Sequence, residues 1–153
     1  MADRLSNEDL GALLDQIREA NGNVLTPRAV VDAARDVNHP LHSRFTWDDG
    51  EAGELWRLEE AAKLIRVVRY KTALPNQGEV KIRKYVSLAS DRASGTSQYR
   101  LTTDVMSTRA GREQLLQQAL AELEALQVKY QILEELCEVW GSVENVKNKH
   151  RRA

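Results

Sequence analysis

Apolar residues near the start of the chain recur with the period of an α-helix. Asn7 is followed by apolar residues three and four positions apart, and Gly22 ends the pattern. A second helix is predicted to begin at Thr26 and Pro27, because a hydroxyl side chain caps a helix and proline fits its first turn. It is expected to end at Pro40, which cannot continue a helix. The apolar faces of the two helices consist of Leu10, Leu13, Leu14 and Ile17, and of Val30, Val31 and Ala34.

A third helix is predicted from about residue 49 to about residue 65. Asp48 stands three residues before Glu51, which is the spacing of a capping box, and Trp47 is positioned to pack on Ala52 as a hydrophobic staple. Helix initiation therefore explains the acidic pair at 48–49 better than a metal-binding or catalytic role does. The apolar face of this helix is formed by Leu55, Leu58, Ala62 and Ile65.

After Ile65 the apolar period changes from helical to alternating, which is typical of β-strands. Residues 66–71 and 80–88 flank a segment rich in turn residues, so they predict a β-hairpin with a long tip. Residues 97–103 predict a third strand of the same sheet. In the second strand, one face is expected to carry Val80, Ile82, Val86 and Leu88, and the opposite face Lys81, Arg83, Tyr85 and Ser87.

The last part of the chain carries a heptad pattern of apolar residues. This pattern predicts one long helix from Leu116 to Trp140, followed by a short basic tail. A second apolar stripe makes the surface wider than a two-stranded coiled coil needs. The surface is therefore expected either to join chains, with a homodimer favoured, or to fold back over the chain's own domain. The predicted interface residues are Leu116, Leu123, Leu126, Tyr130, Leu133, Cys137 and Trp140.

These elements predict an α+β protein in two parts. Residues 1–107 are expected to form a three-helix domain with a small antiparallel β-sheet, and residues 108–153 the long C-terminal helix with its tail. A chain of 153 residues with 42% apolar residues can bury a core of this size. The sequence has no apolar run that would span a bilayer and no secretion signal at its start, which indicates a cytoplasmic protein without membrane contact.

Charge is distributed unevenly along the chain, although the net charge is only −1. Residues 1–65 carry 7 basic and 13 acidic side chains, whereas residues 66–112 carry 10 basic and 3 acidic side chains. The middle segment is therefore where a polyanion would bind. The predicted nucleic-acid-binding residues are Arg66, Arg69, Lys71, Lys81, Arg83, Lys84 and Tyr85.

Two observations limit this hypothesis. The third helix begins with the acids Asp48, Asp49, Glu51 and Glu54, which would repel phosphates, so the hairpin and the basic tail are the expected contacts. A solvated basic sheet face, or pairing with the acidic segment of the same or another chain, explains the charge pattern equally well. DNA, RNA and protein therefore all remain candidate ligands of the basic face.

The sequence contains no motif of the common catalytic classes, such as a nucleophile elbow, a phosphate-binding glycine loop or paired cysteines. We therefore expect no catalytic residue and no cofactor. His39 and His42 have a spacing found in metal ligands, but no third ligand stands beside them, so they are expected to serve the loop and to bind no metal. Cys137 is interpreted as a small apolar residue of the helical seam.

The order of elements over residues 7–88 resembles a winged helix-turn-helix, a fold that implies DNA binding. The strings LTPRAVVDAARD (25–36), PLHSRFTWDD (40–49) and YRLTTDVM (99–106), followed by a long terminal helix, resemble small proteins encoded by bacteriophages and prophages. This resemblance implies a viral or mobile-element origin, located in the bacterial host cell or in the virion, and carries over no catalytic residue.

The expected function is that of a non-enzymatic phage-type protein that binds nucleic acid through its basic hairpin and oligomerises through its C-terminal helix. The alternative is a viral protein–protein interaction factor, either an assembly protein or an inhibitor of a host protein, that binds no nucleic acid.

Overall fold

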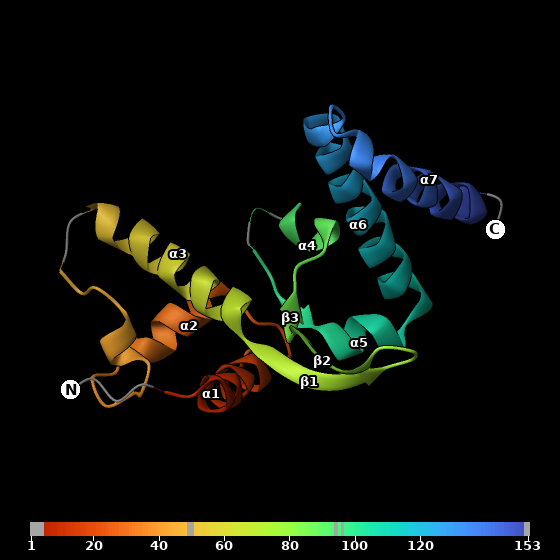
Figure 1. Ribbon diagram of the computed structural model, residues 1–153. Helices are drawn as coiled ribbons and strands as arrows, with labels where there is room; N and C mark the ends of the chain where they lie inside the picture. Colours follow the sequence, from red (N-terminus) through yellow and green to blue (C-terminus); the bar gives the residue numbers. More distant parts are fainter. Residues whose placement is uncertain (1–4, 49–50, 94, 96, 152–153) are drawn as a thin grey trace. The chain divides into compact units, whose positions relative to one another are not determined.

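The computed structural model describes residues 5–48, 51–93, 95 and 97–151, without the side chains of 51 and 52. The chain divides into two compact units, Met1–Ser107 and Thr108–Ala153 (Figure 1). The first unit combines helices with two small antiparallel sheets, and the second unit is helical in its described residues. The predicted α+β class is therefore confirmed.

Three helices open the first unit, as predicted: α1 (Asn7–Ala20), α2 (Pro27–Ala34) and α3 (Glu51–Val67). Ser6 and Asp9 form a capping box at the start of α1. At the start of α2, the Thr26 hydroxyl accepts a hydrogen bond of 3.1 Å from the backbone N–H of Ala29. Local capping thus sets where the first two helices begin.

The second helix ends at Ala34, and the prediction that it extends to Pro40 is wrong. The carboxylate of Asp36 accepts a hydrogen bond of 2.9 Å from the backbone N–H of Asn38, and this local bond competes with the helical ones. The chain then continues in turns to a short 3-10 helix, η1 (His42–Arg44).

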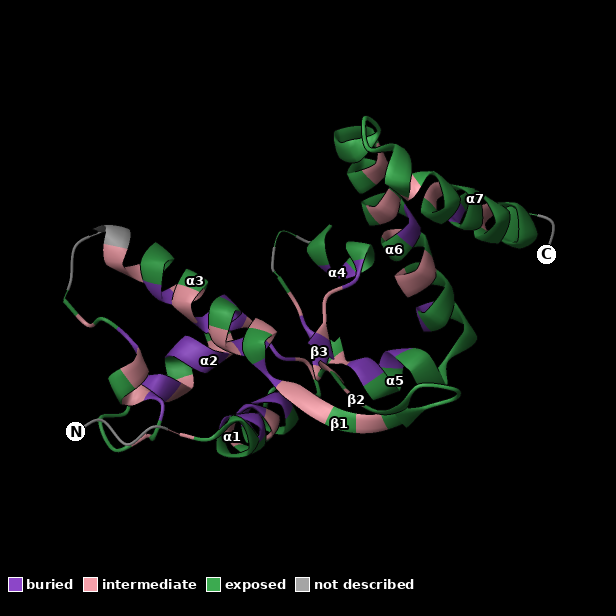
Figure 2. Ribbon diagram, viewed as in Figure 1, coloured by how far each residue is buried: buried purple, intermediate pink, exposed green. Residues whose placement is uncertain are grey.

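The core of the first unit lies where α1, α2 and α3 face one another, as the buried positions in Figure 2 show. Apolar residues at helical spacing meet there, and their removal from water is the main force that holds the three helices together. The largest fully buried side chains are Tyr85, Leu14, Leu25, Leu41, Ile65, Val30, Val31 and Val68.

The predicted hairpin is present, formed by β1 (Arg69–Leu74) and β2 (Gly78–Arg83) in antiparallel register. It begins later than predicted because α3 continues to Val67, and its tip is shorter. Asn76 and Gly78 adopt positive φ angles of 67° and 70°, which allows a tight turn. The strands therefore extend close to the tip.

The expectation of one sheet with three or more strands is wrong. A second sheet consists of β3 (Tyr85–Val86) and β4 (Arg100–Leu101), and an isolated bridge joins Leu25 to Tyr99 beside it. The chain leaves the hairpin at Lys84, whose backbone N–H donates to Val68 and whose carbonyl accepts from Thr102. The short helices α4 (Ala89–Arg92) and α5 (Thr102–Ser107) complete the first unit.

The C-terminal unit contains two helices, α6 (Arg109–Tyr130) and α7 (Cys137–Arg151), so the prediction of one helix from 116 to 140 is wrong. Leu133 between them is extended, with φ −86° and ψ 102°, and leads into a 3-10 turn, η2 (Glu134–Leu136). The charges fit this break, because Lys129 lies in the last turn of α6 and two glutamates begin η2, where helix dipoles favour them.

The heptad residues are consequently divided between two helices. Glu124 of α6 pairs with Lys147 of α7, so the second helix runs back beside the first. Leu120 and Val143 are buried, but most positions of this unit are exposed (Figure 2). Cys137, predicted as a small apolar residue of the seam, begins α7 and is exposed in the single chain. The exposed large apolar side chains of the unit are Leu126, Val128, Tyr130, Ile132, Leu133, Val139 and Val146.

Candidate nucleic-acid interface

The hairpin presents basic side chains on one face, where Lys71, Lys81 and Arg83 are exposed and Arg69 is half-buried. In its register, Arg69 lies opposite Arg83, and Lys71 lies opposite Lys81. Residues directly opposite in an antiparallel pair point to the same side of the sheet, so the four charges share one face. We call these four residues the basic face. The half-buried residues of the other face are Tyr70, Thr72, Val80 and Ile82.

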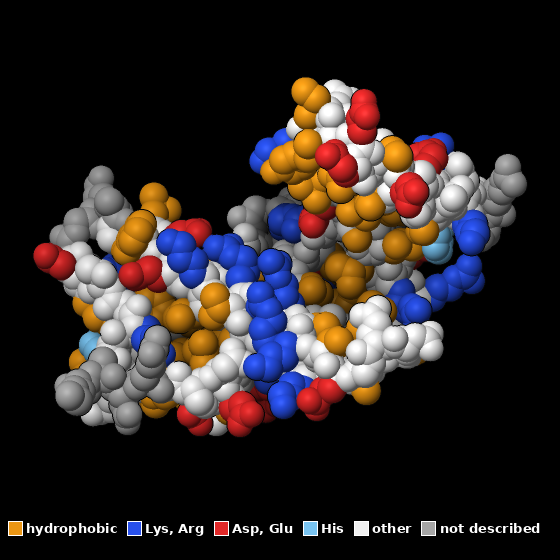
Figure 3. All heavy atoms as spheres, viewed as in Figure 1, with side chains coloured by type: hydrophobic (Ala, Val, Ile, Leu, Met, Phe, Trp, Pro, Cys, Tyr) orange, Lys and Arg blue, Asp and Glu red, His pale blue; other side chains and the backbone are white. Residues whose placement is uncertain are grey.

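The basic face is electrostatically unfavourable without a counterion. Like charges directly opposite each other destabilise a pair of strands, and two such pairs follow one another here. Glu79 offsets part of this charge, because its carboxylate lies 3.4 Å from the Lys71 ammonium. In the space-filling view, Lys and Arg side chains form a band that crosses this part of the first unit (Figure 3). A bound polyanion would relieve the repulsion.

Tyr85 does not belong to this face, and the prediction that it offers a stacking surface beside Lys81 and Arg83 is wrong. Its side chain is buried, with 1% relative exposure. The reason is the break between β2 and β3 at Lys84, which ends the strand alternation on which the prediction rested.

Asp15 of α1 binds the side chains of both residues that follow the hairpin. Its carboxylate accepts hydrogen bonds from Lys84 Nζ at 2.5 Å and from the Tyr85 hydroxyl at 2.8 Å. Burial raises the pKa of Asp15, but the two hydrogen bonds and the nearby positive charges outweigh it and hold the pKa below 3.8. Burial and the bond to Asp15 raise the pKa of Tyr85 far above its ordinary value. Lys84 is thus used within the fold, although it also borders the groove described next.

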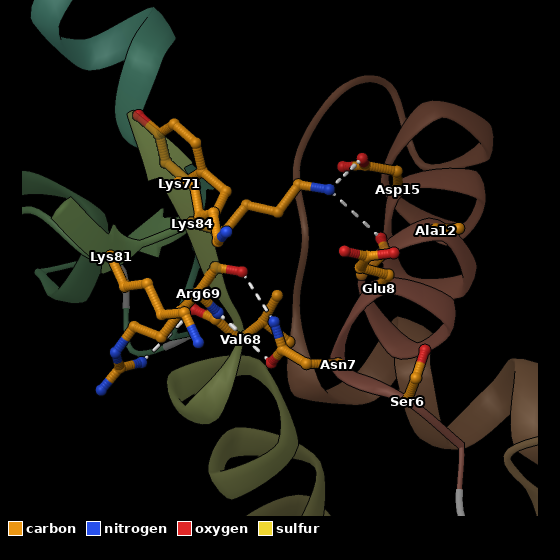
Figure 4. Close-up of a pocket in the computed structure, with 12 residues that line it drawn as sticks. Ser6, Asn7, Glu8, Ala12, Asp15, Val68, Arg69, Lys71, Lys81 and Lys84 are labelled. Carbon is orange, nitrogen blue, oxygen red and sulfur yellow. Dashed lines mark hydrogen bonds and ion pairs between the residues drawn. The ribbon is translucent and has the colours of Figure 1, made fainter. Parts of the chain in front are cut away.

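A groove of about 710 Å³ separates α1 from the hairpin. Figure 4 shows its two walls, with Lys71 and Lys81 on the strand side and Glu8 on the helix side. Several hydrogen bonds join the walls, among them one of 2.7 Å from Asn7 Nδ2 to the Arg69 carbonyl and one from Lys84 Nζ to Asp15. The remaining lining residues include Ser6, Gly11, Ala12, Val68 and Tyr70.

Arg66, the remaining predicted residue, lies in the last turn of α3 and donates to Glu59 over 3.0 Å. Its carbonyl accepts a hydrogen bond of 2.6 Å from the guanidinium of Arg69, which helps to hold Arg69 in place. Arg66 therefore supports the basic face from the end of the helix and is partly neutralised there.

Glu54 is less repulsive to phosphate than its place near the start of α3 suggests. Its carboxylate accepts hydrogen bonds from Arg28, Arg35 and Arg57. Desolvation raises the pKa of Glu54, but the Arg57 bond and the three positive charges prevail and lower it. Asp48 is exposed, whereas Asp49 and the side chain of Glu51 lie outside the described residues.

The loop that contains His39 and His42 is held by its own contacts. Trp47 donates from Nε1 to the His42 carbonyl over 2.8 Å, and its ring stacks on the imidazole with centroids 4.9 Å apart. The Nδ1 atom of His42 lies 2.8 Å from the Ala34 carbonyl. In the described parts of the chain, no group of three or more His, Cys, Asp or Glu side chains is arranged to hold a metal ion. The predicted capping box and staple involve the side chains of 51 and 52, which lie outside the described residues.

Sequence reasoning missed the helix wall of the groove. Asn7, Glu8 and Asp15 are far from the hairpin in sequence, and only the packing of α1 brings them to it. Tyr70 stands between two cations in sequence, Arg69 and Lys71, but strand alternation places its side chain on the opposite face of the hairpin.

Comparisons of the chain with protein-family models, with curated proteins and with solved structures find no match. Across the residues that the structure describes, no helix combines the length and the apolar character needed to cross a membrane.

Proposed function

We propose that this protein is a non-enzymatic binding protein that engages nucleic acid through the basic face of its hairpin. The observation that carries the proposal is the register of β1 and β2, which sets two like-charged pairs on one face, with Lys71, Lys81 and Arg83 exposed and Arg69 half-buried. Such an arrangement costs folding stability, and phosphates would neutralise it. In this proposal the first unit acts as a winged-helix-like domain, and β1 and β2 act as its wing.

The neutralisation of Glu54 by three arginines supports the proposal, because it removes part of the acidic charge that argued against DNA near α3. The phage or prophage origin inferred from the sequence strings fits a small binding protein of this kind and is part of the same proposal.

The test is a fluorescence-anisotropy titration of labelled DNA at low salt. The double variant Lys81→Ala, Arg83→Ala is expected to bind roughly tenfold more weakly, since two phosphate contacts are lost. The double variant Arg112→Ala, Lys129→Ala removes the same charge from the C-terminal unit and is expected to change binding little. Equal weakening by both pairs would show that only net charge matters, and absence of binding by the unchanged protein would refute the proposal.

A second candidate function is protein–protein interaction through the C-terminal unit. The observation in its favour is the apolar surface of α6, α7 and the turn between them, where Ile132 is 86% exposed and Val128 is 69% exposed. Two helices alone bury too little surface for a stable core, so another helical surface is expected to cover them. We propose that a second copy of the chain supplies this covering surface. A host or viral protein is the alternative partner.

A further inference from the structure

The outer face of α3 carries an aromatic side chain beside a cation. Trp56 is 53% exposed, although tryptophan is a residue that folded proteins usually bury well. The ammonium of Lys63, seven residues later on the same face of the helix, lies 4.9 Å from the centroid of the indole ring. About half of the Trp56 surface therefore stays accessible to a ligand even with the lysine in contact.

A shallow hollow beside the Trp56 ring leaves room for a second flat group. Its volume is about 460 Å³, and its lining residues are Thr46, Gly53, Leu55, Trp56 and Glu59. Lys63 does not line this hollow, so a ligand that enters it meets the ring where the lysine leaves it free.

The same face of α3 leads to the basic face of the hairpin. Helical spacing puts one stripe of side chains along it: Trp56, Glu59, Lys63 and Arg66. Arg66 pairs with Glu59, the one acid of this stripe, and the Arg66 carbonyl accepts a hydrogen bond from Arg69 of the basic face. In the space-filling view, Lys and Arg side chains gather over α3 and over the start of β1 on one side of the first unit (Figure 3). The stripe and the basic face thus form one cationic path that begins at an aromatic ring.

This combination of groups fits single-stranded nucleic acid. Every base has a flat face on which an aromatic side chain stacks, while lysine and arginine neutralise the phosphates of the same strand. In a duplex those faces are covered by the neighbouring base pairs, so the ring would add little to binding. Arg66 stands ten residues after Trp56, a rise of about 15 Å along the helix, which accommodates roughly four nucleotides at about 3.4 Å each. One strand can therefore reach from the ring to the basic face.

A protein partner would use the exposed face of α3 differently. It would bury Leu55, which is 72% exposed, together with Trp56, and it would not require cations in line with the ring. Because the stripe continues into Lys63 and the basic face, charge complementarity favours a polyanion over an apolar protein surface.

We propose that an unpaired base of single-stranded nucleic acid stacks on the ring of Trp56, while Lys63 and the basic face bind the phosphates that follow it. The inference rests on the proposed function, because it names the form of nucleic acid that the basic face takes. The Lys63 side chain is long and flexible, so its ammonium reaches the phosphate next to the stacked base.

Anisotropy titrations with one labelled DNA sequence, as a single strand and as the matching duplex, test this inference at low salt. Trp56→Ala is expected to weaken single-strand binding about tenfold and to leave duplex binding nearly unchanged. Trp56→Phe keeps an aromatic ring and should keep most of the affinity. Val67→Ala is the matched control, because Val67 is an apolar residue of the same helix with a similar exposure of 55%, and it should change neither titration.

Tryptophan fluorescence gives a second, direct readout of stacking. A base stacked on the indole of Trp56 quenches its emission, so adding the unlabelled single strand should lower the fluorescence of the unchanged protein. This change should disappear in Trp56→Phe, although that variant still binds the strand.

Three results separate the two proposals. Single-strand binding that survives Trp56→Ala, but falls in Lys81→Ala, Arg83→Ala, overturns the stacking site and leaves the proposed function standing. A loss in Trp56→Ala that is equal for the duplex, or that Val67→Ala reproduces, also overturns the stacking site alone, because neither effect requires an unpaired base. No binding of either form at low salt refutes both proposals, and the exposed face of α3 would then be assigned to a protein partner.

Discussion

Asp15 is the residue on which the junction between α1 and the hairpin depends. Its partly buried carboxylate accepts hydrogen bonds from Lys84 and from the hydroxyl of Tyr85, two residues about seventy positions away. Its pKa below 3.8 means that the folded protein binds the ionised form better than the unfolded chain does. Loss of this carboxylate charge would loosen both the core around Tyr85 and one end of the groove.

We therefore predict that stability depends on pH through Asp15. The contribution of its ionised form is fully present above pH 3.8, the ordinary pKa in the unfolded chain, and is lost as pH falls through the lower folded-state pKa. Urea unfolding measured between about pH 5 and pH 2 should show a smaller loss for Asp15→Asn than for the unchanged protein. At neutral pH that variant should be less stable by about 1 to 2 kcal/mol. Parallel pH profiles for the two proteins would contradict this role.

Elements that start with a local signal could be predicted from sequence, and elements defined by distant contacts could not. The starts of α1 and α2 follow from Ser6 and Thr26, whose caps act within three residues. The end of β2 depends on Lys84, which bonds Val68 and Thr102, and no local pattern records those partners. The basic face was predictable in part, because the alternation of residues along a strand is a local signal that assigns its cations to one face. The α1 wall of the groove was not predictable, because it comes to the hairpin only through distant contacts.

The ion pairs between α2 and α3 lead to a prediction at the scale of the element. Glu54 of α3 accepts from Arg28 of α2 and from Arg35 just after α2, which joins the two helices. It also accepts from Arg57 of its own helix, whose side chain is only 4% exposed. Glu54→Gln should lower the free energy of unfolding by roughly 1 to 3 kcal/mol, because a buried guanidinium loses its charged partner. Glu59→Gln, which affects only the exposed Arg66, should cost less than about 1 kcal/mol. Urea denaturation of the two variants measures this difference. Equal losses of unfolding free energy would refute the stabilising role of Glu54.

At the scale of the whole molecule, the two units have different characters. The first unit buries a core among three helices and carries the basic face, whereas the second unit exposes apolar residues along two helices. The heptad spacing predicted helices in the second unit but not the break near Leu133, since no proline or glycine marks it. Binding in one unit and association in the other would together give a protein with two linked nucleic-acid contacts.

We predict that the chain is a dimer through its second unit, with twice the 17.3 kDa mass of one chain in light scattering at tens of micromolar. Leu126→Asp should produce the monomer, because it places a charge on the exposed apolar surface. Val37→Asp introduces the same charge at an exposed position of the first unit and should leave the dimer intact. A monomeric mass for the unchanged protein would remove this prediction.

The central claim is that the basic face neutralises phosphates, and the salt dependence of DNA binding measures this directly. Each phosphate contact adds about 0.9 to the slope of log K against log salt for duplex DNA. Titrations between about 50 mM and about 200 mM salt should give a steep slope for the unchanged protein, and Lys81→Ala, Arg83→Ala should reduce it by about two. An unchanged slope in that double variant would contradict the claim, because it would mean that neither cation meets a phosphate.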